Sequence, residues 1–195
     1  MRSKKERGTK AVFLDRDGTI IREVDNLKSV SQLRLLPGAA KAIAAINQMG
    51  LLAIVVTNQP VIARGWLDEN GVDEIHAELV KRLKRKGATL DAIYYCPHHP
   101  DANVQEYRVV CRCRKPGIGM IVQASKELGI AIDGSYMVGD RTPDILAGNR
   151  AGLRTILVKT GYGGKDGKHA VEPDHVAMNV AAAVDIIRKE LNGKG

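Results

Sequence analysis

Short apolar runs alternate with segments of helical periodicity along most of the chain. The apolar runs end at turn or polar residues, as buried strands do: 10–14, 51–56, 90–95, 135–138 and 154–158. The helical segments mostly begin near Pro, Asp or Asn and end before Gly: 39–48, 68–86, 119–128, 144–151 and 179–191. This alternation predicts a doubly wound α/β domain, in which helices cover both faces of a mostly parallel sheet.

Two long segments, 96–116 and 160–173, have neither periodicity, and we expect them to be loops. In an open parallel sheet, ligands bind at the carboxyl ends of the strands, where such loops emerge. The sequence has no internal repeat and no linker, so a single domain is expected over 10–195, preceded by a basic, flexible tail over 1–9. No stretch is long enough for a large lid domain.

Composition and charge narrow the class of protein. The chain is 44% hydrophobic and 27% charged, which is typical of a globular protein. It has no run of about 18 apolar residues and no apolar segment behind its first basic residues, which predicts a cytoplasmic protein without a membrane span or secretory signal. Half of the net charge of +8 falls in residues 2–10. The rest suits small phosphate esters, and nucleic acid is not an expected partner because aromatic and basic residues are not interleaved.

Two carboxylates, Asp15 and Asp17, follow the first strand. Residues two apart on a strand point to one side, so these acids would repel each other unless a cation or a proton lay between them. Mg²⁺ prefers such oxygen ligands and also binds phosphate oxygens, so the pair suits phosphoryl chemistry. In isolation, the same pair would fit a solvated acidic turn equally well.

Three further polar sites follow in chain order. Thr57-Asn58-Gln59 comes after the second strand, Arg114-Lys115 precedes the third long helix, and Asp140 and Asp144 follow the fourth strand. Each could be a turn, a solvated loop or a helix cap. Together with the acid pair they form an ordered set of oxygen ligands, hydroxyl donors and cations, as phosphoryl transfer requires.

This set resembles the four motifs of the haloacid dehalogenase-like (HAD-like) phosphatases: D-x-D-G-T, a strand-terminal Thr or Ser, a Lys, and an acidic G-D-x-x-x-D. The match extends from residue 12 to about residue 158. The resemblance implies that Asp15 is a nucleophile that forms a phosphoaspartyl intermediate. Asp17 would then protonate the leaving alcohol and later activate water.

The same resemblance assigns the remaining roles. Thr57 and Lys115 are expected to hold the phosphoryl group, and Asp144 to orient Lys115 or Asp140. The magnesium ligands are expected to be Asp15, Asp140 and the backbone carbonyl of Asp17.

The loop 96–116 contains all three cysteines of the chain and a histidine: Cys96, His98, Cys111 and Cys113. Three Cys and one His form a recognised tetrahedral zinc set, although the alternative is a chance cluster of reduced thiols. The histidinol-phosphate and heptose-bisphosphate phosphatase branch of the HAD-like proteins has such a loop, and this sequence resembles it. A structural Zn²⁺ is therefore expected, since four protein ligands leave no open position.

The spacing within the loop favours one substrate of that branch. His98 and Cys111 are separated by twelve residues, and the longer loop resembles the members that act on D-glycero-D-manno-heptose 1,7-bisphosphate and release its 7-phosphate for surface-glycan (lipopolysaccharide) synthesis. Asn58, Arg64 and Arg114 are expected to bind this sugar. Pro60-Val61 and residues 22–26 depart from the pattern of the branch.

Other functions stay open at this point. Histidinol phosphate is the alternative substrate within the same branch. A nucleic-acid end-processing phosphatase and a zinc-binding module without catalysis are less consistent with the motifs. The sequence leaves the oligomeric state open.

Overall fold

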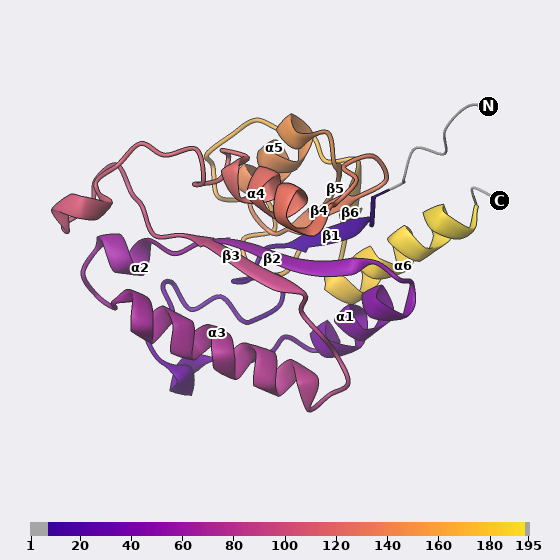
Figure 1. Cartoon of the computed structure of the whole chain (residues 1–195). Coiled ribbons are helices and arrows are strands. Elements are labelled where there is room, and N and C mark those ends of the chain that lie inside the picture. The colour runs from indigo at the N-terminus through magenta and orange to yellow at the C-terminus, as the bar shows by residue number, and fades with distance from the viewer. Residues whose placement is uncertain (1–7, 194–195) are drawn as a thin grey trace.

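The computed structural model describes residues 8–193, and its centre is a six-stranded, fully parallel sheet (Figure 1). The strand order across the sheet is β3-β2-β1-β4-β5-β6. The strands are β1 (Ala11–Leu14), β2 (Leu52–Asn58), β3 (Ala92–Cys96), β4 (Tyr136–Gly139), β5 (Arg154–Val158) and β6 (His175–Ala177). This arrangement confirms the predicted doubly wound α/β class.

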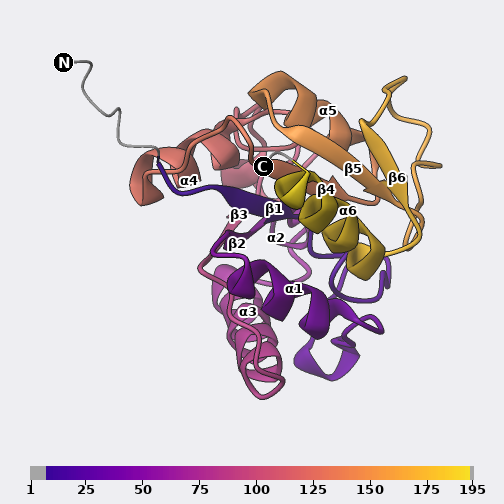
Figure 2. The ribbon, with the colours of Figure 1, turned by 90° about the vertical axis from the view of Figure 1, so that its right-hand side faces the viewer.

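Helices cover both faces of this sheet (Figures 1 and 2). The α-helices are α1 (Ala39–Gln48), α2 (Pro60–Ala63), α3 (Glu69–Lys84), α4 (Gly119–Leu128), α5 (Thr142–Ala151) and α6 (Val180–Asn192). Two short 3-10 helices are η1 (Val30–Gln32) and η2 (Gln105–Tyr107). Within residues 8–193, none of the helices is both long and apolar enough to cross a lipid bilayer.

The alternation of side chains along β1 divides the core into two layers. Val12 and Leu14 pack with buried residues of α1, α3 and α6, whereas Ala11 and Phe13 pack with residues of α4 and α5. All four side chains are fully buried, because the central strand of a parallel sheet is covered on both faces. The low aromatic content is therefore compensated by Ala, Ile, Leu and Val in both layers.

The register of the central strands brings the functional segments together. Leu14 of β1 pairs with Val55 of β2 on one side and with Val138 of β4 on the other. Because the strands are parallel, the residues that follow all three pairs emerge at one edge of the sheet. The loop 97–118 leaves from β3 and returns to α4 at the same edge.

The structure also contains elements that the sequence pattern did not predict. β6 is only three residues long, and the Asp174 carboxylate fastens its start to β5 by accepting hydrogen bonds from the Thr155 N–H at 2.7 Å and hydroxyl at 2.9 Å. α5 begins at Thr142, two residues before the predicted start, because the Asp144 carboxylate accepts the Arg141 N–H at 3.0 Å. Most of the predicted tail lies outside the described residues, and its last residue, Thr9, pairs with Ile130.

Candidate active site

Asp15 and Lys115 meet at the carboxyl edge of the central strands. Asp15 follows β1, and its N–H donates to the Val138 carbonyl at 2.9 Å, which continues the pairing of β1 with β4. The Lys115 ammonium lies 2.6 Å from Asp15 Oδ1 and 2.6 Å from Asp144 Oδ1, and it donates to the Val56 carbonyl at 2.7 Å. One buried cation thus holds two buried carboxylates in place, one of them a hundred residues before it in the chain.

Burial and crowding change the protonation of this centre. Burial raises the pKa of Asp15 to about 7, opposed by Lys115 and reinforced by Asp144 and Asp17. Burial also raises the pKa of Asp140 to about 8, together with the charges of Asp15 and Asp144. For Lys115, burial favours the neutral amine, but Asp144 and Asp15 outweigh it and raise the ammonium pKa above its ordinary value. The centre therefore has more negative charge than one lysine balances.

Asp140 is fully buried between two loops that approach it through their backbones. Its Oδ2 accepts the Tyr162 N–H at 2.8 Å, and its Oδ1 lies 3.4 Å from the Thr19 hydroxyl. Gly18 and Gly161 both have positive φ, and a Cβ at either position would collide with the Asp140 carboxylate. The two glycines thus let the backbone close around this acid.

The donor set fits a divalent cation of the magnesium type. Carboxylate oxygens of Asp15, Asp140 and Asp144 lie within 4.8 Å of one another, and Mg²⁺ binds such oxygens while keeping several waters. The raised pKa values of Asp15 and Asp140 show that burial disfavours their ionised forms, and a bound cation would stabilise those forms. The Asp17 carboxylate is not part of this cluster, so its expected role as a ligand rests on its backbone carbonyl and stays a prediction.

Two buried side chains, Arg16 and Gln59, hold the Asp17 carboxylate in place. Arg16 Nε lies 3.1 Å from Asp17 Oδ2, and Arg16 Nη2 lies 3.1 Å from Asp17 Oδ1. Gln59 Nε2 donates to Asp17 Oδ2 at 3.0 Å and to the Thr57 hydroxyl oxygen at 2.8 Å. Asp17 and Thr57, which the sequence places in different motifs, are therefore linked through one amide.

The Asn58 side chain supports the backbone of Lys115. Its side-chain carbonyl accepts the Lys115 N–H at 3.0 Å, and its side-chain N–H donates to the Lys115 carbonyl at 3.1 Å. Such a paired contact fixes the peptide plane of Lys115 relative to the end of β2. The structure thus gives Asn58 a positioning function, in addition to its place on the wall of the pocket.

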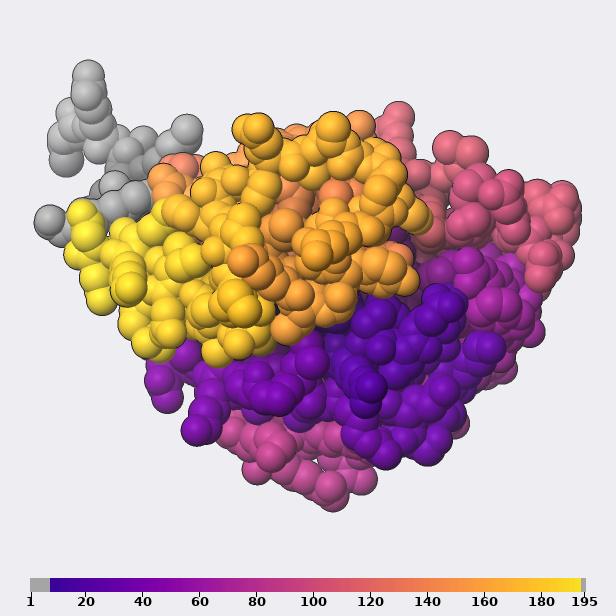
Figure 3. Space-filling model, turned by 180° about the vertical axis from the view of Figure 1, so that it is seen from behind, coloured from indigo at the N-terminus to yellow at the C-terminus, as the bar shows by residue number. Residues whose placement is uncertain are grey.

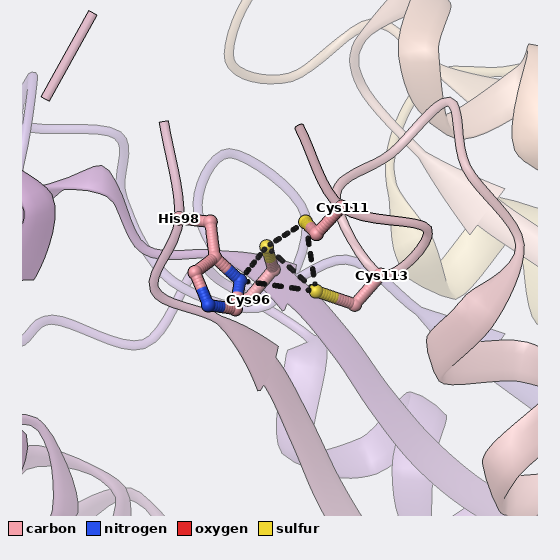
Figure 4. Close-up of side chains that lie close together, drawn as sticks. All are labelled: Cys96, His98, Cys111 and Cys113. Atoms are coloured by element: carbon pink, nitrogen blue, oxygen red, sulfur yellow. Dashed lines mark hydrogen bonds between the residues drawn. The ribbon is translucent and has the colours of Figure 1, made fainter. Parts of the chain in front are cut away.

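Cys96, His98, Cys111 and Cys113 converge beside this edge of the sheet (Figure 4). The sulfur of Cys96 lies 3.4 Å from that of Cys111 and 3.1 Å from that of Cys113, while His98 Nδ1 lies 3.4 Å from the Cys113 sulfur. Burial and the neighbouring thiols raise the pKa of Cys96, so its thiolate needs a cation beside it. Three sulfurs and one imidazole nitrogen in this arrangement fit a tetrahedral Zn²⁺.

Arg114 contacts the sulfur cluster, which consists of Cys96, His98, Cys111 and Cys113, and it also lines the pocket. Its backbone N–H donates to the Cys111 sulfur at 3.4 Å, and its guanidinium donates to the His98 carbonyl at 3.1 Å. Burial lowers its pKa, as do the charges of Arg64 and Arg141. Arg64 itself is not among the residues that line the pocket, and its guanidinium lies 4.7 Å from the centre of the Trp66 ring.

A cavity of about 340 Å³ lies above Asp15, Asp17, Thr57 and Lys115. Figure 3 shows how the segment after β5 (orange), the segment after β1 (indigo) and the loop 97–118 (pink) lie around this part of the surface. Several residues that line the pocket were not among the predicted site residues: Glu23, His99, Arg141, Tyr162 and Lys168. Arg141 lies 3.9 Å above the Tyr162 ring, a contact across the loops after β4 and β5 that no local motif indicates.

Comparisons with known proteins agree with this geometry. The HAD-hydrolase-like family model matches residues 112–183. The chain is 41% identical over 155 residues to the D-glycero-beta-D-manno-heptose-1,7-bisphosphate 7-phosphatase of Photorhabdus laumondii, with 79% of this chain and 82% of the relative covered. It is 43% identical over 153 residues to the protein of the same name from Pasteurella multocida, with 78% and 83% covered.

A solved structure has the same fold over nearly its whole length. The D,D-heptose 1,7-bisphosphate phosphatase from B. bronchiseptica, crystallised with magnesium and phosphate, superposes with a TM-score of 0.83 at 32% sequence identity. The match covers 93% of this chain and 99% of that structure. The similarity therefore extends over the sheet, both helical layers and the long loops.

Proposed function

Because the chain belongs to the D-glycero-beta-D-manno-heptose-1,7-bisphosphate 7-phosphatase family of HAD-like phosphatases, we propose that it releases the 7-phosphate of this heptose bisphosphate, with Asp15 as nucleophile. The observation that carries the proposal is the Asp15 carboxylate, held 2.6 Å from the Lys115 ammonium at the floor of a pocket. The nucleophile is thereby oriented before the substrate arrives.

In the first step, an Asp15 carboxylate oxygen attacks the phosphorus atom at C7. The bond between phosphorus and the sugar oxygen breaks, the electron pair stays on that oxygen, and Asp17 gives it a proton. The product of this step is a phosphoaspartyl group on Asp15 and a free alcohol. Asp17 is suited to this role because its side chain is partly exposed, on the same wall of the pocket as Asp15.

In the second step, Asp17, now ionised, takes a proton from a water molecule that attacks the phosphoaspartyl group. Inorganic phosphate leaves and the Asp15 carboxylate is restored, so the same residue acts as acid and then as base. Lys115 and the Thr57 hydroxyl hold the phosphoryl oxygens in both steps. Asp15 and Asp140 would hold a Mg²⁺ ion, which would supply positive charge beside the transferring phosphoryl group.

The sulfur cluster supports this reaction by fixing the loop 97–118. We assign it a structural Zn²⁺ that fixes the segment leading into Arg114 and Lys115. Arg114, Arg141 and Lys168 then provide positive charge at the pocket wall, where a second phosphate of the substrate can bind. We assign the chain to the cytoplasm, where cysteines that form no disulfide, such as Cys96, Cys111 and Cys113, are the rule.

The test compares two substrates. Purified protein should have a higher kcat/KM for heptose 1,7-bisphosphate than for histidinol phosphate, with heptose 1-phosphate as the remaining product. Arg114→Ala should narrow this difference by about tenfold, chiefly by weakening the bisphosphate reaction, because a guanidinium contact to phosphate is lost. Arg112→Ala is the matched control, since Arg112 is exposed and does not line the pocket. A higher kcat/KM for histidinol phosphate would overturn the assignment.

A further inference from the structure

We propose that Arg16 is a positioning residue for the acid–base group Asp17, and that Gln59 and His76 hold it in place. The proposal rests on the function assigned above, because it concerns the proton that Asp17 delivers. Arg16 lies between the two catalytic aspartates in the sequence, but its side chain turns away from the pocket and is 1% exposed. The Arg16 guanidinium pays a desolvation cost for its burial, so its pairing with the partly exposed Asp17 carboxylate needs an explanation beyond charge attraction.

The contacts orient the carboxylate of Asp17 from one side. Arg16 Nε and Gln59 Nε2 donate to Oδ2 at 3.1 and 3.0 Å, and Arg16 Nη2 lies 2.9 Å from the same oxygen. Among the described residues, Oδ1 accepts from Arg16 Nη2 alone, at 3.1 Å. Oδ2 is therefore anchored, and Oδ1 is the oxygen left to hand a proton to the leaving group.

Arg16 is itself fixed by groups from two other elements. Its Nη2 donates to the Gln59 side-chain carbonyl at 2.8 Å, and its Nη1 lies 3.0 Å from Nε2 of His76, on α3. Burial, together with the charge of Arg16, lowers the pKa of His76 to about 3. The imidazole is consequently neutral, and its Nε2 accepts a hydrogen bond from Nη1 of Arg16.

This network leaves Arg16 little freedom. A planar guanidinium offers donors in a fixed fork, whereas an ammonium offers a point charge, so lysine at position 16 would keep the charge without the two-point grip. Orientation matters because a proton donor must lie within hydrogen-bond reach of the oxygen that it protonates. Arg16 thus controls proton delivery without touching the substrate.

The test is the dependence of the rate on the leaving group. An alkyl phosphate releases a poor leaving group that needs the proton of Asp17, whereas p-nitrophenyl phosphate releases a phenolate that leaves without one. For Arg16→Lys we expect kcat/KM to fall about 10²-fold for heptose 1,7-bisphosphate, and by less than about threefold for p-nitrophenyl phosphate. Asp17→Asn removes the acid–base group itself, so it should give the same difference between the two substrates, with a loss of kcat/KM on the sugar phosphate at least as large.

The comparison uses kcat/KM because it covers only binding and the first chemical step. The second step, which is common to all substrates, does not enter it. Equal losses on the two substrates would overturn the proposal and leave Arg16 a merely structural role, and so would an unchanged rate on the sugar phosphate. Circular dichroism and Tm must accompany the kinetics, because Arg16 is buried.

Two more variants keep the test decisive. If Arg16→Lys does not fold, His76→Ala removes the anchor at Nη1 without touching Asp17, and it should give the same signature at about tenfold. Arg82→Lys is the matched control, because Arg82 is a partly buried arginine that binds Glu78 and the Leu33 carbonyl, and it should leave both rates unchanged. If the wild type prefers another alkyl phosphate to the heptose ester, the substrate assignment fails, and the leaving-group comparison is made on that ester.

Discussion

The acidic centre and the sulfur cluster both follow strand ends, Asp15 after β1 and Cys96 at the end of β3. At the acidic centre, the ends of β1 and β4 and the start of α5 position three buried carboxylates, and Lys115 contacts two of them from the loop 97–118. At the sulfur cluster, three of the four donor residues lie in the irregular loop 97–118.

This difference separates two ways of building a site. Around Asp15, the packed sheet fixes the donor atoms, so the site keeps its geometry as long as the fold does. Around Cys96, the proposed metal would hold the donor residues together, because His98, Cys111 and Cys113 lie outside helices and strands. We therefore expect substitutions at the first site to affect chemistry and those at the second to affect stability.

The largest effect is expected from Asp15→Asn. The change keeps the volume and removes the nucleophile, so magnesium-dependent phosphate release should fall by about 10⁴-fold or more, while the circular dichroism spectrum stays that of the wild type. Substantial turnover by a folded Asp15→Asn protein would contradict the mechanism. It would also remove the chemical half of the comparison.

A smaller effect on rate and a larger one on stability are expected from Cys113→Ser. Elemental analysis of the wild type should find about one zinc per chain, and the variant should lose it. We expect Tm to fall by about 10 °C, and activity by about tenfold, as Arg114 and Lys115 lose their fixed approach.

Two neighbouring histidines, one inside the sulfur cluster and one outside it, provide the control for this variant. His98→Ala removes the imidazole of the sulfur cluster and should resemble Cys113→Ser, whereas His99→Ala leaves the cluster intact and should keep the zinc. A protein that is free of zinc and yet fully stable and active would show that the sulfur cluster is incidental.

The smallest effect concerns pH at the acidic centre. The pKa values of Asp15 and Asp140 are raised to about 7 and 8 from an ordinary 3.8, so the folded protein binds protons more tightly than the unfolded chain between about pH 4 and 8. The stability from these two groups is present at low pH and is lost as pH rises through that range. Without magnesium, Tm should fall by about 5 °C from pH 5 to pH 8.

Magnesium should restore most of this loss, and more at pH 8 than at pH 5, because the cation binds the ionised carboxylates. Dialysis into magnesium-free buffer is preferable to a chelator, which would also remove zinc. Asp140→Asn is the matched variant and should flatten the profile. A Tm that magnesium raises equally at both pH values would refute the coupling.

Much of the fold follows from local pattern. The bounds of α1, α4 and β5 match the predicted ranges 39–48, 119–128 and 154–158, because Gly or Pro lies near the ends of both helices and β5 is a compact apolar run. β6 was missed because three residues are too few for any periodicity, and the Asp174–Thr155 contact that secures them is distant in sequence. α2 was missed because it is only four residues long.

The candidate site divides in the same way. Strand order alone predicts that Asp15, Thr57 and Asp140 share one edge of the sheet, because parallel strands end together. The contacts of Arg16 with Gln59 and His76 span 43 and 60 residues and depend on how α3 packs, which no motif encodes. The Arg64 guanidinium lies 4.7 Å from the centre of the Trp66 ring, a contact that no motif of the sequence indicates.

The walls of the pocket have a consequence for the history of this protein. Three of them come from the segments 23–27, 99–101 and 162–169, and none of these supplies a group that takes part in bond breaking. Substitutions in any one of these segments can therefore change which sugar binds, while the chemistry at Asp15 stays the same. A lineage with this architecture can acquire new phosphate esters through drift in its loops, and laboratory evolution of substrate preference should begin in the same three segments.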